Sequence, residues 1–368
     1  MTTNIPDGNV PKAEISVPKV TIIVVNWNGW KDTLECFESL LPIIERREAT
    51  IICCDNGSTD DSVRHILHWA NKHFRQGFDS GQDRTCAASC PAFTLLGTDR
   101  NLGYAGGNNV GIRRALELAS CEFVWLLNND TIVTDRAVST LLLAARNTPN
   151  VAAFGSTTVD YFNPSRVQCA GGCRYHPMLT VTRQALRGWD LEEALARRRD
   201  IKLDYIAGSA MFLRTAAMRN IGLLNETFFL YYEEADYARR LKEHGYRISW
   251  CKESIVFHKG GQSTRSRSQL NPEGSWLSEY HENLSTLKYT ANHHQKLFPL
   301  AATFRFAAKL LLAAFRRPRA VAPLLRAYRD FFGVGGKSPV ARRNPASIRL
   351  IFSGGLCGST DNDLHHPC

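Results

Sequence analysis

The sequence of 368 residues lacks any long apolar segment. No run of about 18 uninterrupted apolar residues occurs, so we predict that no helix spans a membrane. Residues 1–19 also lack the apolar core of a secretory signal peptide. We therefore expect the protein to work in the cytosol, either free or at the inner face of the membrane.

The two commonest phosphate-binding loops are also missing. A dinucleotide-binding loop needs Gly-x-Gly-x-x-Gly directly after the first strand, where residues 26–30 read Asn-Trp-Asn-Gly-Trp. No Gly-x-x-x-x-Gly-Lys-Ser/Thr loop occurs in the sequence. A bound nucleotide would therefore be held by other groups.

Acidic residues are scarce at the C-terminal end. The chain has 45 Lys and Arg against 35 Asp and Glu, a formal net charge of +10. Residues 1–262 hold 30 basic and 29 acidic residues, whereas residues 263–368 hold 15 and 6. Such an excess suits nucleic acid, an anionic substrate or an acidic membrane surface. Because no nucleic-acid recognition motif accompanies the charge, we do not expect a nucleic-acid partner.

The first third of the chain contains four short apolar runs with amphipathic stretches between them. Continuous apolar runs are typical of strands that are buried on both faces. Their alternation with helical stretches, such as 30–41 and 111–119, predicts an α/β fold with a doubly wound sheet flanked by helices. The runs are Val20–Val25, Thr50–Cys54, Phe93–Gly97 and Phe123–Leu127.

Other segments of the chain have less regular patterns. Residues 71–92 are polar and aperiodic, which indicates a surface insertion. Residues 183–202 are charged, and we expect them to form an exposed helix. A second block then predicts a strand at 205–213, a helix at 233–244 and a strand at 247–257.

Polar side chains follow the predicted strands, at the edge where such sheets bind ligands. Asn26 and Asn28 follow the first strand, and Asp55 ends the second. The Asp55 carboxylate could accept hydrogen bonds from a base or a ribose. The same segment could also form a turn in which Ser58 or Thr59 caps the next helix. Both interpretations can hold together.

Residues 101–111 place four glycines ahead of and within the start of a predicted helix. A glycine costs about 1 kcal/mol relative to alanine inside a helix. Close approach of the backbone to a ligand therefore explains the glycines better than helix propensity does. We take Asn101 and Gly103 as candidate nucleotide-binding residues.

The fourth strand ends in three oxygen-bearing side chains, Asn128, Asn129 and Asp130. A divalent cation that bridges a diphosphate prefers oxygen ligands and needs only one or two protein carboxylates. The same residues also favour an ordinary turn. His258 ends a later strand, and together with Asp130 it forms a candidate site for Mg or Mn.

Two carboxylates near the start of the predicted helix 233–244 are catalytic candidates. Helical spacing places Glu234 on the same stripe as Tyr237 and Leu241, so it points inward. A desolvated carboxylate has a raised pKa and is a better general base. Asp236 aligns instead with Arg239 and Arg240, and we expect it to pair with arginine.

Together these segments resemble glycosyltransferase family 2, the inverting nucleotide-sugar enzymes of GT-A fold, and especially its rhamnosyltransferase-like branch. The resemblance covers residues 20 to about 262 and implies that Asn26 and Asp55 contact the nucleotide, with Asn128 and Asn129 beside it. Six segments carry it in order: Val20–Asn28, Cys54–Asp61, Asn101–Asn109, Trp125–Asp130, Phe229–Asp236 and Val256–His258.

The resemblance also implies a metal site and a catalytic base. Asn128 and Asp130 stand where the family has its Asp-x-Asp metal motif, His258 would complete the site, and Glu234 would be the base. Asn128 replaces the first aspartate of that motif, and Glu234 stands where the family often has aspartate. The predicted reaction transfers a sugar from a nucleoside-diphosphate sugar to a hydroxyl of a glycan or lipid-linked acceptor. A nucleotide-sugar-binding protein without transferase activity and a sugar nucleotidyltransferase are the alternatives.

We predict three regions. Residues 1–19 form an N-terminal arm, 20–262 the catalytic domain, and 263–368 a basic helical extension whose tail is partly disordered. The catalytic domain divides into a nucleotide-binding half, 20–150, and an acceptor half, 151–262, in which residues 208–210 form a wall.

A helix is predicted at 299–319, with Arg305, Lys309 and Arg316 on one face. That basic face suits an anionic membrane surface. Alternatively, the helix packs on the catalytic domain and leaves its cations in solvent.

Overall fold

The computed structural model describes residues 18–76, 91–198, 200–260, 272–316, 318–333 and 346–356. Residues 1–17 of the predicted arm at 1–19, most of the predicted insertion at 71–92 and the tail beyond 356 lie outside these ranges. The elements in chain order are β1 (Val20–Asn26), α1 (Trp30–Glu45), β2 (Ala49–Asp55), α2 (Ser62–His73), β3 (Phe74–Gln76), β4 (Phe93–Thr98), α3 (Gly103–Glu117), β5 (Phe123–Asn128), β6 (Thr131–Val133), α4 (Ala137–Asn147), β7 (Val151–Asp160), β8 (Asn163–Ala170), β9 (Gly172–His176), β10 (Val181–Gln184), α5 (Leu191–Ala196), β11 (Tyr205–Ile206), β12 (Ala210–Arg214), α6 (Thr215–Ile221), α7 (Glu233–Glu243), β13 (Arg247–His258), α9 (Pro272–His293), α10 (Phe298–Arg316), η1 (Pro318–Ala320), α11 (Val321–Phe332) and β14 (Ile348–Leu356).

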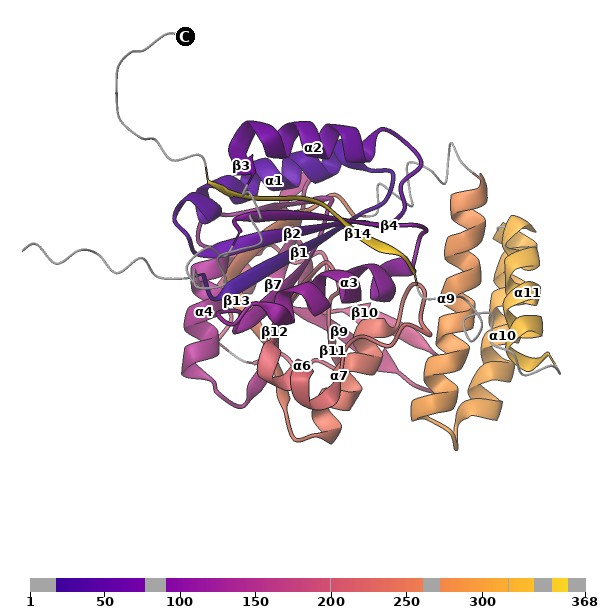
Figure 1. Cartoon of the computed structure of the whole chain (residues 1–368). Coiled ribbons are helices and arrows are strands. Elements are labelled where there is room, and N and C mark those ends of the chain that lie inside the picture. The colour runs from indigo at the N-terminus through magenta and orange to yellow at the C-terminus, as the bar shows by residue number, and fades with distance from the viewer. Residues whose placement is uncertain are drawn as a thin grey trace, which may run out of the picture.

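A mixed sheet forms the centre of the fold, with helices on both faces (Figure 1). Its strands run in the order β3-β14-β4-β2-β1-β5-β12-β7-β13-β6, and β8 pairs with β7. Strands β4, β2, β1 and β5 are parallel, whereas β12 runs antiparallel to β5 and β7. All four predicted strands of the first third are confirmed. The chain therefore has the GT-A type α/β architecture that the resemblance implies.

Alternating residues of the central strands build two apolar cores, one on each face of the sheet. Ile22 and Val24 of β1 pack with α1, α2 and α4, whereas Ile23 packs with α3, α6 and α7. Helices α1 and α2 lie on one side of the sheet and α3 on the other (Figure 1). Burial on both faces explains why these strands read as continuous apolar runs.

The glycine-rich segment lies inside α3, because this helix begins at Gly103. A Cβ atom on Gly107 would meet Val25 Cγ1 at 2.9 Å, and one on Gly111 would meet Ile23 Cγ2 at 2.7 Å. Gly107 and Gly111 therefore approach the sheet closely, whereas a Cβ on Gly103 would meet the backbone of Phe229. Glycine here allows the helix axis to come close to β1.

The exposed helix predicted at 183–202 is wrong. Residues 181–184 form β10, which pairs antiparallel with β9 in a separate sheet of order β10-β9-β11, and only 191–196 are helical. Gly188 lies between the two with φ +82°. Strand pairing of this hairpin with β11 outweighs the local preference of its charged residues, which reflects tertiary context rather than helix propensity.

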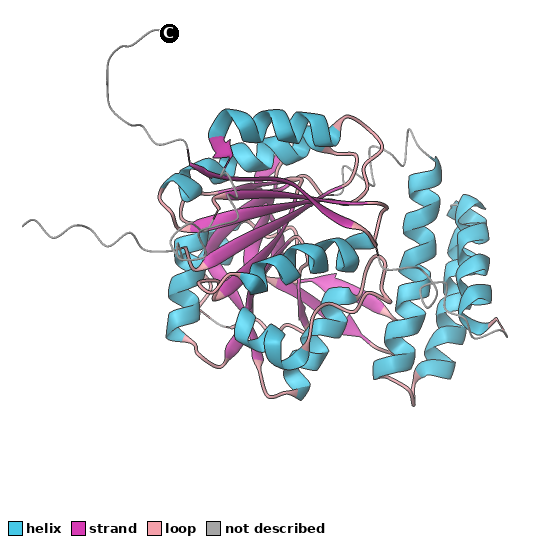
Figure 2. Ribbon diagram, in the orientation of Figure 1, coloured by secondary structure: helices cyan, strands magenta, loops and turns pink. Residues whose placement is uncertain are grey.

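Helices α9, α10 and α11 stand beside the sheet domain (Figure 2). Helix α10 confirms the predicted helix, but the expected solvent-facing basic side is wrong. Arg305 is buried and donates to Glu282 Oε1, Asn283 Oδ1 and Thr180 O at 3.0–3.2 Å, and Lys309 donates to Glu282 at 3.1 Å. These two cations therefore hold α10 against α9 and the β9–β10 turn.

After α11 the chain returns to the main sheet. Strand β14 pairs antiparallel with β4 and β3, which the predicted helical extension did not anticipate. Among the described residues, no helix is long and apolar enough to cross a bilayer.

Candidate active site

The carboxyl ends of β1, β2 and β5 meet at one edge of the sheet. Asn26 is opposite Asp55 in the parallel register, and Asn128 is opposite Val25. The fold therefore brings the first three predicted site segments together, although they are separated by up to about a hundred residues of sequence.

Asn26 is fully buried and orients Asp55. Its Nδ2 donates to Asp55 Oδ1 at 2.8 Å, and its Oδ1 accepts from the Thr33 hydroxyl at 2.8 Å. Asp55 Oδ2 accepts from the backbone N–H of Ser58 at 3.1 Å, so this carboxylate also closes the turn after β2. Because both amide atoms of Asn26 are bonded within the protein, its contribution to a ligand would act through Asp55.

Asn28 joins the loops that follow β1 and β2. It has φ +51°, and its Oδ1 accepts from the backbone N–H of Thr59 at 2.8 Å. The predicted capping by Ser58 or Thr59 is wrong, because α2 begins later, at Ser62. There the Asp60 carboxylate accepts from the backbone N–H of Ser62 at 3.0 Å.

Asn101 and Gly103 are tied to the same loop through Asn56. The Asn56 amide donates to Asn101 Oδ1 at 3.0 Å and to the Gly103 carbonyl at 3.1 Å. Asn101 Oδ1 also accepts from the Gly103 N–H at 2.8 Å. Asn56 was not a candidate from the sequence, yet it links the ends of β2 and α3. These bonds hold the predicted nucleotide-binding loops in one arrangement.

The three polar residues at the end of β5 point in different directions. Asn129 donates to the Thr33 hydroxyl at 3.0 Å, towards α1. The buried Asp130 instead places Oδ1 at 3.1 Å from Nε2 of His258, and Asn128 Nδ2 lies 3.4 Å from the same nitrogen. The structure therefore brings Asn128, Asp130 and His258 together, and it directs Asn129 away from them.

Gln168 of β8 fixes the imidazole of His258. Its Oε1 lies 2.6 Å from His258 Nδ1, which assigns a proton to Nδ1 and turns Nε2 towards Asp130. At 3.1 Å, Nε2 and Asp130 Oδ1 can share a proton or, with neutral imidazole, hold a cation between them. No sequence signal identified Gln168, because the contact depends on how β8 pairs with β7.

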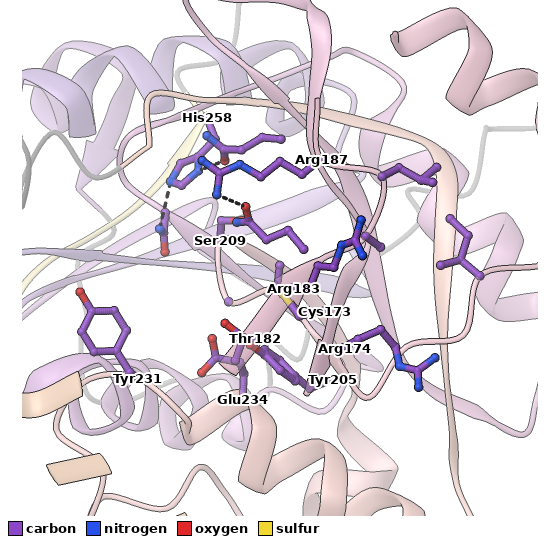
Figure 3. Close-up of a pocket in the computed structure, with 18 of the residues that line it drawn as sticks. Cys173, Arg174, Thr182, Arg183, Arg187, Tyr205, Ser209, Tyr231, Glu234 and His258 are labelled. Atoms are coloured by element: carbon purple, nitrogen blue, oxygen red, sulfur yellow. Dashed lines mark hydrogen bonds between the residues drawn. The ribbon is translucent and has the colours of Figure 1, made fainter. Parts of the chain in front are cut away.

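A cavity of about 1070 Å³ opens at this edge (Figure 3). His258, Asn128, Ser209 and Gly208 line it together with Glu233 and Glu234 at the start of α7. The wall predicted at 208–210 is therefore present in its first two residues, whereas Ala210 is buried in β12. Asp55 and Asn26 are not among the residues that line this cavity.

Glu234 is a half-buried residue whose carboxylate lies in this cavity. The Oε2 atoms of Glu233 and Glu234 are both buried without a hydrogen-bond partner. Burial raises the pKa of Glu234 to about 7, and burial together with the charge of Glu234 raises the pKa of Glu233. The two residues before the helix, Tyr231 and Tyr232, have φ of +67° and +71°, a conformation that costs about 1–3 kcal/mol per residue and is common at functional sites.

Asp236 lies outside the cavity lining. It forms the expected arginine pair, with Arg240 Nε at 2.8 Å, and a second pair with His293 of α9 at 2.8 Å. Although burial raises the pKa of Asp236, the hydrogen bond from His293 and the charge of Arg240 outweigh it and lower the pKa. Asp236 therefore anchors α7 to α9, and its position gives it no contact with the cavity.

Comparison with known proteins places the chain among glycosyltransferases. The chain is 25% identical over 254 residues to the low-salt glycan biosynthesis hexosyltransferase Agl10 of Haloferax volcanii, covering 68% of this chain and 71% of that protein. It is 24% identical over 290 residues to an N-acetylglucosaminyl-diphospho-decaprenol L-rhamnosyltransferase of Mycobacterium tuberculosis, covering 74% of this chain and 85% of that protein. A solved structure of GalNAc-T7 with UDP, GalNAc and Mn2+ superposes with a TM-score of 0.49 at 12% identity, over 67% of this chain and 44% of that one.

The family is shown by a match to more than half of the chain. This match covers residues 21–221, which hold the ends of β1, β2 and β5, and it ends before Glu234 and His258. Glu234 and His258 both line the cavity, and this observation does not depend on the family match. The chain belongs to glycosyl transferase family 2.

Proposed function

We propose that this protein is an inverting glycosyltransferase that moves a hexosyl residue from a nucleoside-diphosphate sugar to a hydroxyl of a glycan or lipid-linked acceptor. The observation that carries the proposal is Glu234, whose buried Oε2 has no hydrogen-bond partner and lies in the cavity that His258 and Asn128 also line. L-Rhamnose is the first candidate sugar, because one of the relatives is an L-rhamnosyltransferase.

Glu234 is proposed as the general base. A pKa of about 7 keeps a substantial fraction of the carboxyl ionised at neutral pH while making it a stronger base than an exposed glutamate. The acceptor hydroxyl would lose its proton to Glu234 and attack the anomeric carbon from the face opposite the leaving nucleoside diphosphate. Attack from that face inverts the configuration. Burial and the charge of Glu234 raise the pKa of Glu233, which favours a protonated Glu233 beside an ionised Glu234.

Asp130 and His258 are proposed to hold a divalent cation, Mg or Mn. One carboxylate oxygen and one imidazole nitrogen are a small ligand set, which fits a cation whose remaining ligands come from diphosphate oxygens and water. Such a cation would neutralise the negative charge that develops on the leaving diphosphate. Gln168 keeps the Nε2 lone pair of His258 directed at this position.

The nucleotide is proposed to bind at the ends of β1 and β2. Asp55 is held by Asn26, and Asn28 and Asn101 hold the loops on either side. A base or ribose that contacts Asp55 would place its diphosphate towards Asn128 and Asp130, because β5 lies next to β1 in the sheet. In this arrangement the nucleotide-binding half, residues 20–150, binds the donor, and residues 151–262 bind the acceptor.

A donor screen with purified protein tests the proposal. The readout is release of nucleoside diphosphate from a panel of nucleoside-diphosphate sugars, including dTDP-L-rhamnose, with Mn2+, with Mg2+ and with chelator. We expect one donor to be turned over only with a cation, and Glu234→Gln to bind that donor without turning it over. Arg146→Ala, an exposed change on α4, is the matched control. Binding of a donor with no turnover under any condition would support a binding protein instead.

A further inference from the structure

Five cations line the acceptor side of the active-site cavity. They are Arg174, Arg183, Arg187, Arg197 and Lys202. All come from β9, β10 or the segment that leads through α5 to β11, and Figure 3 shows three of them with Glu234 and His258. Residues 1–262 hold 30 basic and 29 acidic residues, so this concentration does not follow from the composition of the domain.

Acidic residues do not balance these cations. Arg174 pairs with Asp204 at 2.9 Å. Arg187 donates to the neutral side chain of Gln184 at 3.0 Å. The lining contains three acidic residues, Asp200, Glu233 and Glu234, of which both glutamates have raised pKa values. The cavity wall therefore carries a positive excess beside the proposed base.

Arg197 is an independent observation that points to a ligand at this side of the cavity. Its guanidinium carbon lies 5.7 Å from the centroid of the Trp189 ring, within the range of a cation–π contact. Its Nε is buried and has no hydrogen-bond partner among the described residues. A buried donor of this kind costs free energy unless an acceptor is supplied.

We propose that this wall binds a phosphate or diphosphate group on the acceptor substrate, next to the hydroxyl that Glu234 deprotonates. Arginine presents several N–H donors in a plane and matches phosphate oxygens in pairs. The inference rests on the proposed glycosyl transfer and names the chemistry of its acceptor. A sugar carried on a lipid through a diphosphate has this chemistry, and so has a soluble sugar phosphate.

The five cations stand apart from the segments that are proposed to hold the nucleotide. None of the five cations comes from β1, β2, β5 or the loops that follow them. Asp55 and Asn28, the residues proposed for the nucleotide, do not line this cavity. Arg174 and Arg183 stand instead on the three-stranded sheet β10-β9-β11, and Arg187, Arg197 and Lys202 lie in the segment between β10 and β11.

Binding of three probes tests the proposal on the full chain. The probes are farnesyl diphosphate, inorganic diphosphate and neutral farnesol, titrated by calorimetry in the presence of saturating nucleoside diphosphate and Mn2+, so that the donor site is filled. We expect both diphosphates to bind, and Arg183→Ala with Arg187→Ala to weaken them by about tenfold or more. Stronger binding of farnesyl diphosphate than of inorganic diphosphate identifies a lipid source, and equal binding identifies a soluble one.

Two controls separate this inference from the proposed function. Arg146→Ala should leave diphosphate binding unchanged, and the double arginine variant should retain donor hydrolysis. Diphosphate binding that the double variant does not weaken overturns the arginine site while leaving the transferase intact. Loss of donor binding in the same variant would place these arginines on the donor instead and would also overturn the inference.

A different observation concerns the outer face of α10. Five large apolar side chains there are exposed: Leu300 by 62%, Phe304 by 50%, Leu311 by 61%, Leu312 by 48% and Phe315 by 81%. Their spacing places them along one side of the helix. The side of α10 that carries Arg305 and Lys309 faces α9, where both cations bind Glu282. The apolar stripe therefore contributes nothing to the described core.

We infer that this stripe, Leu300 to Phe315, inserts into the surface of an anionic bilayer. Charge supports that choice over a protein partner. Residues 283–329 contain nine Lys and Arg and no Asp or Glu, and the stripe runs directly into Arg316-Arg317-Pro318-Arg319. An apolar helix face flanked by cations is typical of helices that lie in the interface of anionic membranes. Arg305 also connects this helix to Thr180, at the turn of the β9–β10 hairpin that carries Arg183.

Vesicle flotation tests the membrane contact. We expect the protein to float with vesicles of phosphatidylglycerol and phosphatidylcholine, less with phosphatidylcholine alone, and Leu311→Ser with Phe315→Ser to abolish flotation. Leu143→Ser, which changes a leucine on α4 that is 59% exposed, is the matched control. Light scattering after gel filtration adds a second readout. A dimer that the double variant converts to monomer, without vesicle binding, would assign the stripe to a second copy and overturn the inference.

Discussion

The Nδ1 atom of His258 lies 2.6 Å from the Oε1 atom of Gln168. This contact joins the last residue of β13 to a residue of β8, two strands that both pair with β7. It places a proton on Nδ1 and so turns Nε2 towards Asp130. The proposed metal site therefore depends on a glutamine that acts through His258 and also lines the cavity.

Replacing Gln168 tests this dependence. Gln168→Leu removes the acceptor for Nδ1, so we expect the Mn2+ concentration for half-maximal activity to rise about 10- to 100-fold. Gln168→Glu, which keeps an acceptor, should restore most of the affinity. Titration of donor hydrolysis with Mn2+ measures both. An unchanged Mn2+ dependence in the leucine variant would show that His258 does not bind the cation.

Glu234 should control the pH dependence of turnover. Because the base acts when deprotonated and its pKa is about 7, we expect kcat to fall as the pH is lowered through about 7. Glu234→Gln should reduce kcat by about 100- to 10,000-fold. Steady-state rates measured between about pH 5.5 and about pH 8.5 give the profile. A wild-type profile that stays flat through 7 would exclude Glu234 as the base.

The same carboxyl should destabilise the folded protein at alkaline pH. Its pKa in the folded state is raised from the ordinary 4.5 to about 7, so the folded state binds more protons in that interval and the free energy of unfolding falls as the pH rises through it. We therefore expect Glu234→Gln to raise the melting temperature relative to the wild type at pH 8 but not at pH 4. Equal melting-temperature differences at both values would contradict this.

Asp236 should matter for stability rather than for turnover. Asp236→Asn leaves Arg240 and His293 without their carboxylate, and breaking a buried pair costs about 3–5 kcal/mol. The lowered pKa means that this contribution is present above the ordinary value of 3.8 and is lost as the pH falls below it. Urea denaturation at pH 7 gives the loss. Glu243→Gln, which breaks an exposed pair on the same helix, should cost about 1 kcal/mol or less.

Helix α3 should not tolerate side chains on its inner face. A Cβ on Gly111 would meet Ile23 Cγ2 at 2.7 Å and Cys54 Sγ at 3.0 Å, so we expect Gly111→Val to reduce the free energy of unfolding by about 1–3 kcal/mol. Gly355→Ala, where a Cβ would meet nothing within 4 Å, should change it little. Chemical denaturation of both variants measures the difference. A Gly111→Val protein as stable as Gly355→Ala would mean that α3 lies further from the sheet.

Local patterns were sufficient for the parts of the site that end central strands. Asn26, Asp55 and Asn128 were found because strands buried on both faces read as uninterrupted apolar runs, and the polar residue that ends each run marks the ligand edge. The glycines of α3 were predicted to mark a close approach of the backbone, but the sequence did not identify the group that they approach. The sequence pattern alone could not show whether these glycines approach a ligand or the sheet.

The sequence by itself determined the α/β architecture and the order of the strands along the chain, because these follow from periodicities of two and 3.6 residues. The helical stripe placed Glu234 on the apolar side of α7, whereas in the structure Glu234 is half-buried at the cavity and its neighbour Glu233 is the buried one. Only the tertiary structure decided that 181–184 pair as a strand, that Gln168 holds His258, and that Arg305 turns inward while Leu311 and Phe315 face outward. An amphipathic pattern specifies that a helix has two faces. Which face is buried depends on the partner, and here Glu282 of α9 and Thr180 of the β9–β10 turn attract the cations of α10.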